Sequence, residues 1–144
     1  MNTALRWFRR AAEEGLAHAR TSLGYAYQTG RGVTRDYAAA ARWYSMASAQ
    51  GDAVAQGNLA YLYQNGLGVE SDAGRALSLF RAAAAGGYGY AQRNLGRAYQ
   101  YGMGVPRDLE AAINWYDRAS ANGDPGAHDL ALKAREELAD TPSR

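Results

Sequence analysis

The chain has 144 residues, of which 47% are apolar and 21% charged, a composition typical of one globular domain. Sixteen basic and fourteen acidic side chains leave a net charge of +2, which is too small for the many phosphate contacts of nucleic-acid binding. The lack of cysteine excludes disulfides, thiol nucleophiles and thiolate metal sites. No apolar run approaches the ~20 residues that span a bilayer, so we expect no membrane partner. We predict a cytoplasmic protein, or a periplasmic one if Met1 is not the natural start.

The first predicted element is a helix over residues 1–15 that carries Trp7 and Phe8 and ends at Gly15. The same glycine returns every 36 residues, at Gly51, Gly87 and Gly123. A fixed period of this size indicates stacked copies of one helical unit. The predicted divisions are a half repeat (1–15), three full repeats (16–51, 52–87 and 88–123) and a C-terminal capping helix (124–144).

This first helix has the sequence of the second half of a repeat. Trp7 and Phe8 therefore lose part of the cover that a preceding helix would give them. We expect either a fragment of a longer repeat array or self-association through the N-terminal end.

Each full repeat is predicted to form two helices. In the repeat 16–51, Ala19, Leu23 and Tyr27 recur every four residues and mark the buried stripe of a first helix. This helix should end at Gly30, because glycine adopts the left-handed conformation that closes helices. Asp36 then lies at the N-cap position of the second helix.

The second helix of each unit carries an aromatic-rich pair, which we expect in the core. The pairs are Trp7-Phe8, Trp43-Tyr44, Leu79-Phe80 and Trp115-Tyr116. In the first helices, Gly24 and Gly96 lie where a side chain would keep neighbouring helices apart. The last element keeps an apolar stripe with charged residues elsewhere, as a polar capping helix should, and Asp124 with Pro125 is expected to begin it.

The recurring pattern is A-x-A-x-x-x-L-G-x-x-Y-x-x-G-x-G-V-x-x-D, followed by A-x-x-W-Y-x-x-A and a closing Gly. It resembles the Sel-one-like repeat (SLR), a relative of the tetratricopeptide repeat (TPR), although Ala60 and Leu79 depart from it. The resemblance implies an all-α fold, a right-handed α-solenoid of 36-residue helix-turn-helix repeats with a TPR-like superhelix of about eight helices. It also implies a non-enzymatic scaffold or adaptor that binds a protein or extended peptide in a concave groove lined by the first helices.

Function is sought at groove positions that the fold leaves open. These carry Tyr and Arg side chains, which give contact area with polar handles, and Asn and Gln amides, which can pair with a peptide backbone. The candidate residues are Tyr25, Gln28, Asn58, Tyr61, Gln64, Asn65, Tyr90, Arg93, Asn94, Arg97, Gln100 and Tyr101. The recurring Gln is expected to face solvent, where it either binds a partner or is a helix-forming surface residue. Arg93 has a second interpretation, an ion pair with Asp129.

Catalytic constellations are missing from the sequence, so we expect no enzyme, cofactor or metal site. His18 and His128 lie at different repeat positions with no second ligand beside them. Glu136 and Glu137 are adjacent on one helix, which favours a solvated helix end over acid-base chemistry. The competing function is a structural repeat segment of a larger multidomain protein with no ligand of its own.

Overall fold

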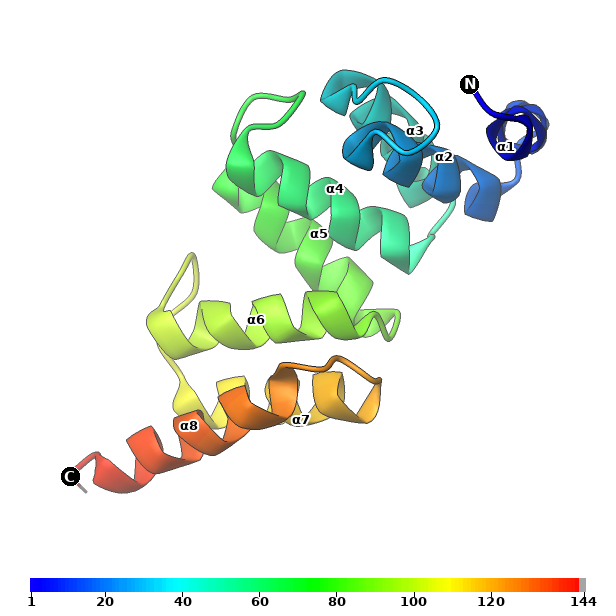
Figure 1. Cartoon of the computed structure of the whole chain (residues 1–144). Helices are drawn as coiled ribbons and strands as arrows, with labels where there is room; N and C mark the ends of the chain where they lie inside the picture. The colour runs from blue at the N-terminus through cyan, green and yellow to red at the C-terminus, as the bar shows by residue number, and fades with distance from the viewer. Residues whose placement is uncertain (143–144) are drawn as a thin grey trace.

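The computed structural model describes residues 1–142, which contain eight α-helices and no strand. In chain order they are α1 (Thr3–Glu13), α2 (Ala17–Thr29), α3 (Tyr37–Ala49), α4 (Ala53–Asn65), α5 (Ala73–Ala85), α6 (Gly89–Tyr101), α7 (Leu109–Ala121) and α8 (Ala127–Asp140). Each helix packs mainly against its neighbours in the chain (Figure 1). Packing between neighbours is the mark of a solenoid, and the predicted all-α solenoid of paired helices is confirmed.

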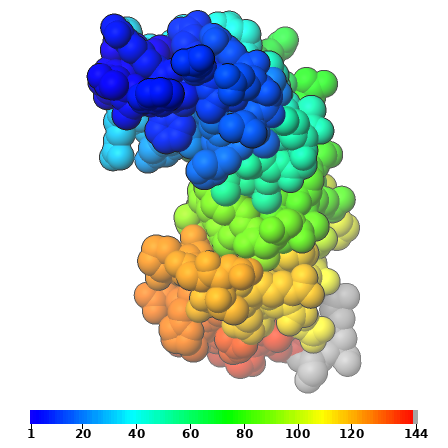
Figure 2. Space-filling view, turned by 90° about the vertical axis from the view of Figure 1, so that its right-hand side faces the viewer, coloured from blue at the N-terminus to red at the C-terminus, as the bar shows by residue number. Residues whose placement is uncertain are grey.

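The helix pairs stack into an elongated body. Figure 2 shows α1 and α2 in blue at one end, α7 and α8 in yellow to red at the other, and an outline that narrows at the green residues between them. The first helices α2, α4 and α6 therefore follow one another along the body.

Glycine and aspartate fix the helix ends as predicted. The first helices end at Gly30, Gly66 and Gly102, all left-handed, with φ of 73°, 63° and 69°. The second helices α3, α5 and α7 begin at aspartates that accept a backbone N–H at 3.0 Å. These N-caps are Asp36, Asp72 and Asp108.

The start of α8 differs from the prediction. This helix begins at Ala127, and its N-cap residue Gly126 provides no side-chain hydrogen bond. Asp124 instead pairs with Arg93, at 2.8 Å from its Nε. Asp124 Oδ2 and Arg93 Nε are both buried and form an ion pair without hydrogen-bond geometry, so this carboxylate serves repeat packing and not the helix end. Residues 143–144 of the expected capping segment lie outside the described residues.

The aromatic pair divides between core and edge. Tyr44 and Tyr116 are fully buried and Phe80 is 5% exposed, whereas Trp43 and Trp115 are only half-buried at the margin of their clusters. The prediction that the Trp column is core was therefore only partly right, since Trp43 and Trp115 pack against the core clusters without being buried. Adjacent residues point about 100° apart on a helix, so only one of each pair can face the interior.

Two glycines allow these tyrosine rings to pack closely. A Cβ added at Gly24 would lie 2.7 Å from the Tyr44 ring, and one at Gly96 would lie 2.7 Å from the Tyr116 ring. Neither distance is sterically allowed, so the predicted role of these glycines in helix approach is confirmed.

The N-terminal helix shows the expected loss of cover. Trp7 is 67% exposed, and Phe8 is also exposed. Self-association through this end stays a prediction, as does the division of the chain into repeat segments.

Candidate functional site

The face formed by the first helices is hollowed beside α1. This hollow has a volume of about 590 Å³ and is bounded by α1, α2, α4 and Tyr88, the residue before α6. Tyr25 and Asn58, both predicted groove residues, line it together with Phe8 and Val54. Phe8, Tyr25 and Val54 are all exposed. Exposed apolar side chains gathered on a concave patch are typical of a contact surface.

A smaller hollow of about 230 Å³ lies at the centre of the same face. Four predicted residues line it with Tyr88: Gln28, Asn58, Tyr61 and Tyr90. The Tyr88 hydroxyl donates a hydrogen bond to Asn58 Oδ1 at 3.1 Å, and the rings of Tyr88 and Tyr90 are 5.5 Å apart between centroids. The structure thus joins α2, α4 and α6 through a cluster of tyrosines and amides.

Burial keeps these tyrosines protonated. It raises the pKa of Tyr90 to about 12, and it raises the pKa of Tyr88 as well. A tyrosine is already neutral near pH 7, and burial extends this neutral range to higher pH, so both hydroxyls can donate and accept hydrogen bonds. The face offers neutral polar contacts at its centre.

The glutamine column is bound internally in two of three repeats, contrary to the solvent-facing prediction. The Tyr44 hydroxyl donates to Gln28 Oε1 at 2.6 Å, and the Tyr116 hydroxyl donates to Gln100 Oε1, also at 2.6 Å. Gln100 is only 5% exposed. A buried tyrosine hydroxyl needs a hydrogen-bond partner, and the glutamine provides it. This packing role accounts for the recurrence of Gln28 and Gln100.

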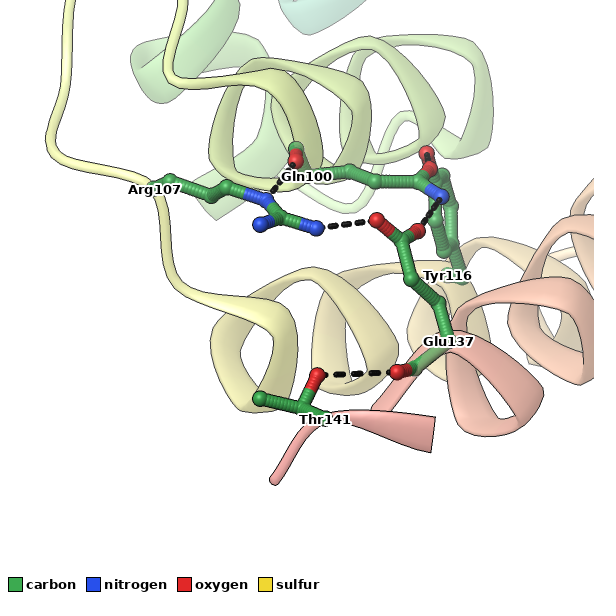
Figure 3. Close-up of polar contacts among 5 residues, drawn as sticks. All are labelled: Gln100, Arg107, Tyr116, Glu137 and Thr141. Carbon is green, nitrogen blue, oxygen red and sulfur yellow. Dashed lines mark hydrogen bonds and ion pairs between the residues drawn. The ribbon is translucent and has the colours of Figure 1, made fainter. Parts of the chain in front are cut away.

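Helix α8 closes the C-terminal end of the face. Figure 3 shows Glu137 between Gln100 and Arg107: its Oε2 accepts from Gln100 Nε2 at 3.1 Å, and its Oε1 pairs with the Arg107 guanidinium. Arg107 Nε also donates to the Gln100 carbonyl at 3.0 Å. Glu137 is thus part of a polar network and not merely a solvated helix end, and Gln100 is not available to a partner.

Arg93 is also held by the chain itself. It pairs with Asp124, whose side chain is 6% exposed, and its guanidinium lies 5.5 Å from the Tyr90 ring centroid. The alternative pairing with Asp129 was wrong in its partner, since Asp124 lies in the turn that packs on α6. A buried carboxylate needs this charge, so Arg93 is a structural residue.

The remaining predicted residues fall into two groups: some make a hydrogen bond within their own helix, and the others are exposed. Asn65 and Asn94 each donate to a carbonyl oxygen of their own helix, four residues earlier. Gln64, Arg97 and Tyr101 are exposed. These three side chains remain accessible on α4 and α6.

Sequence reasoning missed three side chains that line the larger hollow. Phe8 was assigned to the core, and Val54 and Tyr88 were not considered. Tyr88 occupies a column whose other members are Leu16, Asp52 and Asp124. An aromatic residue where the repeat has none was the signal that could have identified it.

Residues 1–142 contain neither a cluster of metal-ligand side chains nor a helix that could span a membrane. No three His, Asp or Glu side chains lie close enough together to hold a metal ion. No helix in this range combines the length and the apolar character needed to cross a bilayer.

A family model described as Sel1 repeat matches residues 1–16, 17–52, 53–88 and 89–124. The chain belongs to the Sel1 repeat family. Sel1 repeats are generally protein-interaction scaffolds. No curated protein matches the chain.

Two solved structures resemble this Sel1 repeat chain. One is a protective antigen of uropathogenic Escherichia coli strains with an SLR fold, 42% identical, with a TM-score of 0.79 over 86% of this chain. The other is a Sel1 repeat protein from Oxalobacter formigenes, 33% identical, with a TM-score of 0.82 over 91% of this chain. This chain spans 27% of the length of the first protein and 54% of the second.

Proposed function

We propose that the chain is a non-enzymatic scaffold that binds a protein or an extended peptide along the face of α2, α4 and α6. The observation that carries this proposal is the pair of hollows that share Asn58 and Tyr88 on that face. The two hollows are edged by the exposed side chains of Tyr25 and Tyr61. Exposed tyrosines are not needed for helix packing, and they are enriched among residues that dominate binding energy.

The chemistry of this face fits a polypeptide. Tyrosine rings give apolar contact area, and their hydroxyls and the Asn58 amide can pair with backbone N–H and C=O groups. Arg31 lies 5.8 Å from the Tyr25 ring centroid, which adds a positive charge at the edge of the larger hollow. A segment of peptide that runs across α2 and α4 would meet all of these groups.

The test is a titration with a partner purified after crosslinking in cells. The double variant Tyr25→Ala/Tyr61→Ala should weaken binding by at least ~2 kcal/mol, or roughly 30-fold in Kd. Met46→Ala is the matched control, because Met46 is an exposed apolar side chain on the second helix α3. It should leave Kd unchanged.

The competing function, a structural segment without a ligand of its own, makes the opposite prediction. A partner whose Kd is the same for the double variant and the wild type would contradict binding at this face. Circular dichroism melts of both variants are needed, and they should overlay that of the wild type.

A further inference from the structure

A separate pocket lies where the middle repeat meets the next one. It has a volume of about 340 Å³ and is lined by α4, α5, α6 and the turn at Met103 and Gly104. Leu77, Phe80 and Met103 form apolar walls, and the amide of Gln64 lies at its edge. Among residues 1–142, no charged side chain lines this pocket. This volume is at the small end of ligand pockets, so it suits one large side chain.

Small residues on α5 open this pocket. Ala73 lies in the column where the flanking repeats have Tyr37 and Leu109. Tyr37 packs against the core cluster of its own repeat, and Leu109 is buried. The middle repeat therefore lacks a large side chain at a position that its neighbours fill with tyrosine or leucine.

The turn that follows α6 also leaves room. In the preceding turn, a Cβ at Gly68 would lie 2.3 Å from the backbone carbon of Tyr37, so that turn lies directly on the second helix α3. At Gly104 the nearest atom to an added Cβ is a terminal methyl of Leu77, at 3.2 Å. The turn at Gly104 therefore rests on a side chain and does not close over the α5 backbone.

The middle repeat also lacks a hydroxyl group. Phe80 occupies the place of Tyr44 and Tyr116, whose hydroxyls bind the glutamines of their repeats. The corresponding glutamine, Gln64, is exposed and makes no side-chain hydrogen bond within residues 1–142. Its amide oxygen is a free acceptor at the edge of an apolar pocket.

We propose that this pocket binds one tyrosine side chain of a partner polypeptide. The ring lies against Leu77, Phe80 and Met103, and the hydroxyl donates to the amide oxygen of Gln64. Tyr37 shows that a tyrosine suits this position in the repeat, and Gln28 and Gln100 show that this glutamine accepts from a phenol. The proposal rests on the proposed scaffold function and specifies the chemistry of one anchor.

The uncharged lining excludes a charged version of the same ligand. A phosphotyrosine would bring a doubly charged group to a pocket with no cation to pair with it, at a large desolvation cost. A phenylalanine would fill the apolar part but leave Gln64 without its hydrogen bond. The pocket should therefore rank tyrosine above phenylalanine, and both above phosphotyrosine.

The first experiment is a titration of the isotope-labelled full chain followed by NMR, with N-acetyltyrosinamide as the probe. Shift changes should concentrate at the backbone amides of Leu77, Phe80 and Met103. N-acetylphenylalaninamide should bind roughly 2- to 12-fold more weakly, as the net free energy of one hydrogen bond implies. Absence of shifts at the pocket, or equal affinity of the two probes, would overturn the proposal.

Two variants and one control sharpen this test. Ala73→Leu introduces the residue of the next repeat and should abolish binding of both probes, whereas Ala82→Leu, on an exposed position of α5, should bind both like the wild type. Phe80→Tyr supplies the hydroxyl internally and should remove the preference for the tyrosine probe. Unchanged binding to Ala73→Leu would contradict the assigned pocket, provided that its melt shows a folded chain.

This proposal and the scaffold function can fail separately. The variant Tyr25→Ala/Tyr61→Ala leaves the pocket intact, so it should bind N-acetyltyrosinamide like the wild type. If the probe fails to bind while this variant still loses its partner, the face binds without a tyrosine anchor. If the probe binds and the variant keeps its partner, the pocket proposal is supported and partner binding at the face of α2, α4 and α6 is contradicted.

Discussion

The middle repeat and its two neighbours differ in how the aromatic ring of the second helix packs on the first helix. In the first and third full repeats a glycine of the first helix lies under a tyrosine ring whose hydroxyl binds a glutamine. In the middle repeat the three residues are Ala60, Phe80 and Gln64. The middle repeat thus has an alanine methyl where its neighbours have a glycine, and a ring that carries no hydroxyl. Because Phe80 has no hydroxyl, Gln64 receives no hydrogen bond from it. The same glutamine column therefore serves packing in two repeats and stays available for other contacts in the middle one.

The largest expected effect comes from removing a buried ring. Tyr116→Ala should lower the free energy of unfolding by about 3–5 kcal/mol, because it leaves a cavity and takes away the hydrogen-bond donor of the buried Gln100 Oε1. Gln64→Ala should change it by less than ~0.5 kcal/mol, because that side chain is exposed. Urea unfolding of both variants measures the difference. Equal losses would contradict the distinction between the repeats.

The next largest loss of stability is expected when the glycine under the ring is replaced. Gly96→Ala should lower the free energy of unfolding by about 1–3 kcal/mol, because its methyl would lie 2.7 Å from the Tyr116 ring. Ala60→Gly should cost only about 1 kcal/mol, the usual penalty for glycine within a helix.

A double variant tests whether the two substitutions of the middle repeat are coupled. Gly96→Ala with Tyr116→Phe reproduces the middle-repeat pair in the third repeat, and urea unfolding should show a smaller loss than the sum of the single losses. Strict additivity would mean that the alanine and the phenylalanine of the middle repeat are unrelated.

Much of the fold follows from the sequence because helix ends depend on local chemistry. Gly30 and Asp36 were assigned from residue type and spacing, and each has the predicted geometry. Asp124 was misassigned because its partner Arg93 is 31 residues away, and no local rule weighs an N-cap against a distant ion pair. Where the local sequence does not determine the role of a residue, as at Asp124, contacts with distant residues decide it.

The candidate site was harder to predict for a related reason. Tyr25 and Tyr61 were correctly placed outside the core, since helix geometry alone separates them from the buried stripe. Gln28 and Gln100 were misjudged, because a helical wheel gives the direction of a side chain but not what a neighbouring helix brings to it. The Tyr44 hydroxyl reaches Gln28 from the second helix of the repeat.

A smaller effect, of opposite sign, is expected from restoring the hydroxyl in the middle repeat. Phe80→Tyr should raise the free energy of unfolding by about 0.5–1.5 kcal/mol, because the new hydroxyl can donate to Gln64. Urea unfolding measures the gain, and the double variant Phe80→Tyr/Gln64→Ala is the control that should lose it. A gain that persists in the control would show that the hydroxyl does not bind Gln64.

The smallest effect is absent at neutral pH and appears only in alkali. Burial raises the pKa of Tyr116 to about 12, above the ordinary value of about 10 that it regains on unfolding. Between these two values the unfolded chain loses the proton and the folded chain keeps it, so stability falls as pH rises from about 10 to 12. Tyr116→Phe should make this fall shallower, and Phe80→Tyr should make it steeper by adding a further tyrosine hydroxyl to the same column. Urea unfolding at pH 8, 10 and 11 measures the slopes. Identical slopes in the wild type and both variants would mean that these hydroxyls titrate alike in the folded and unfolded chain.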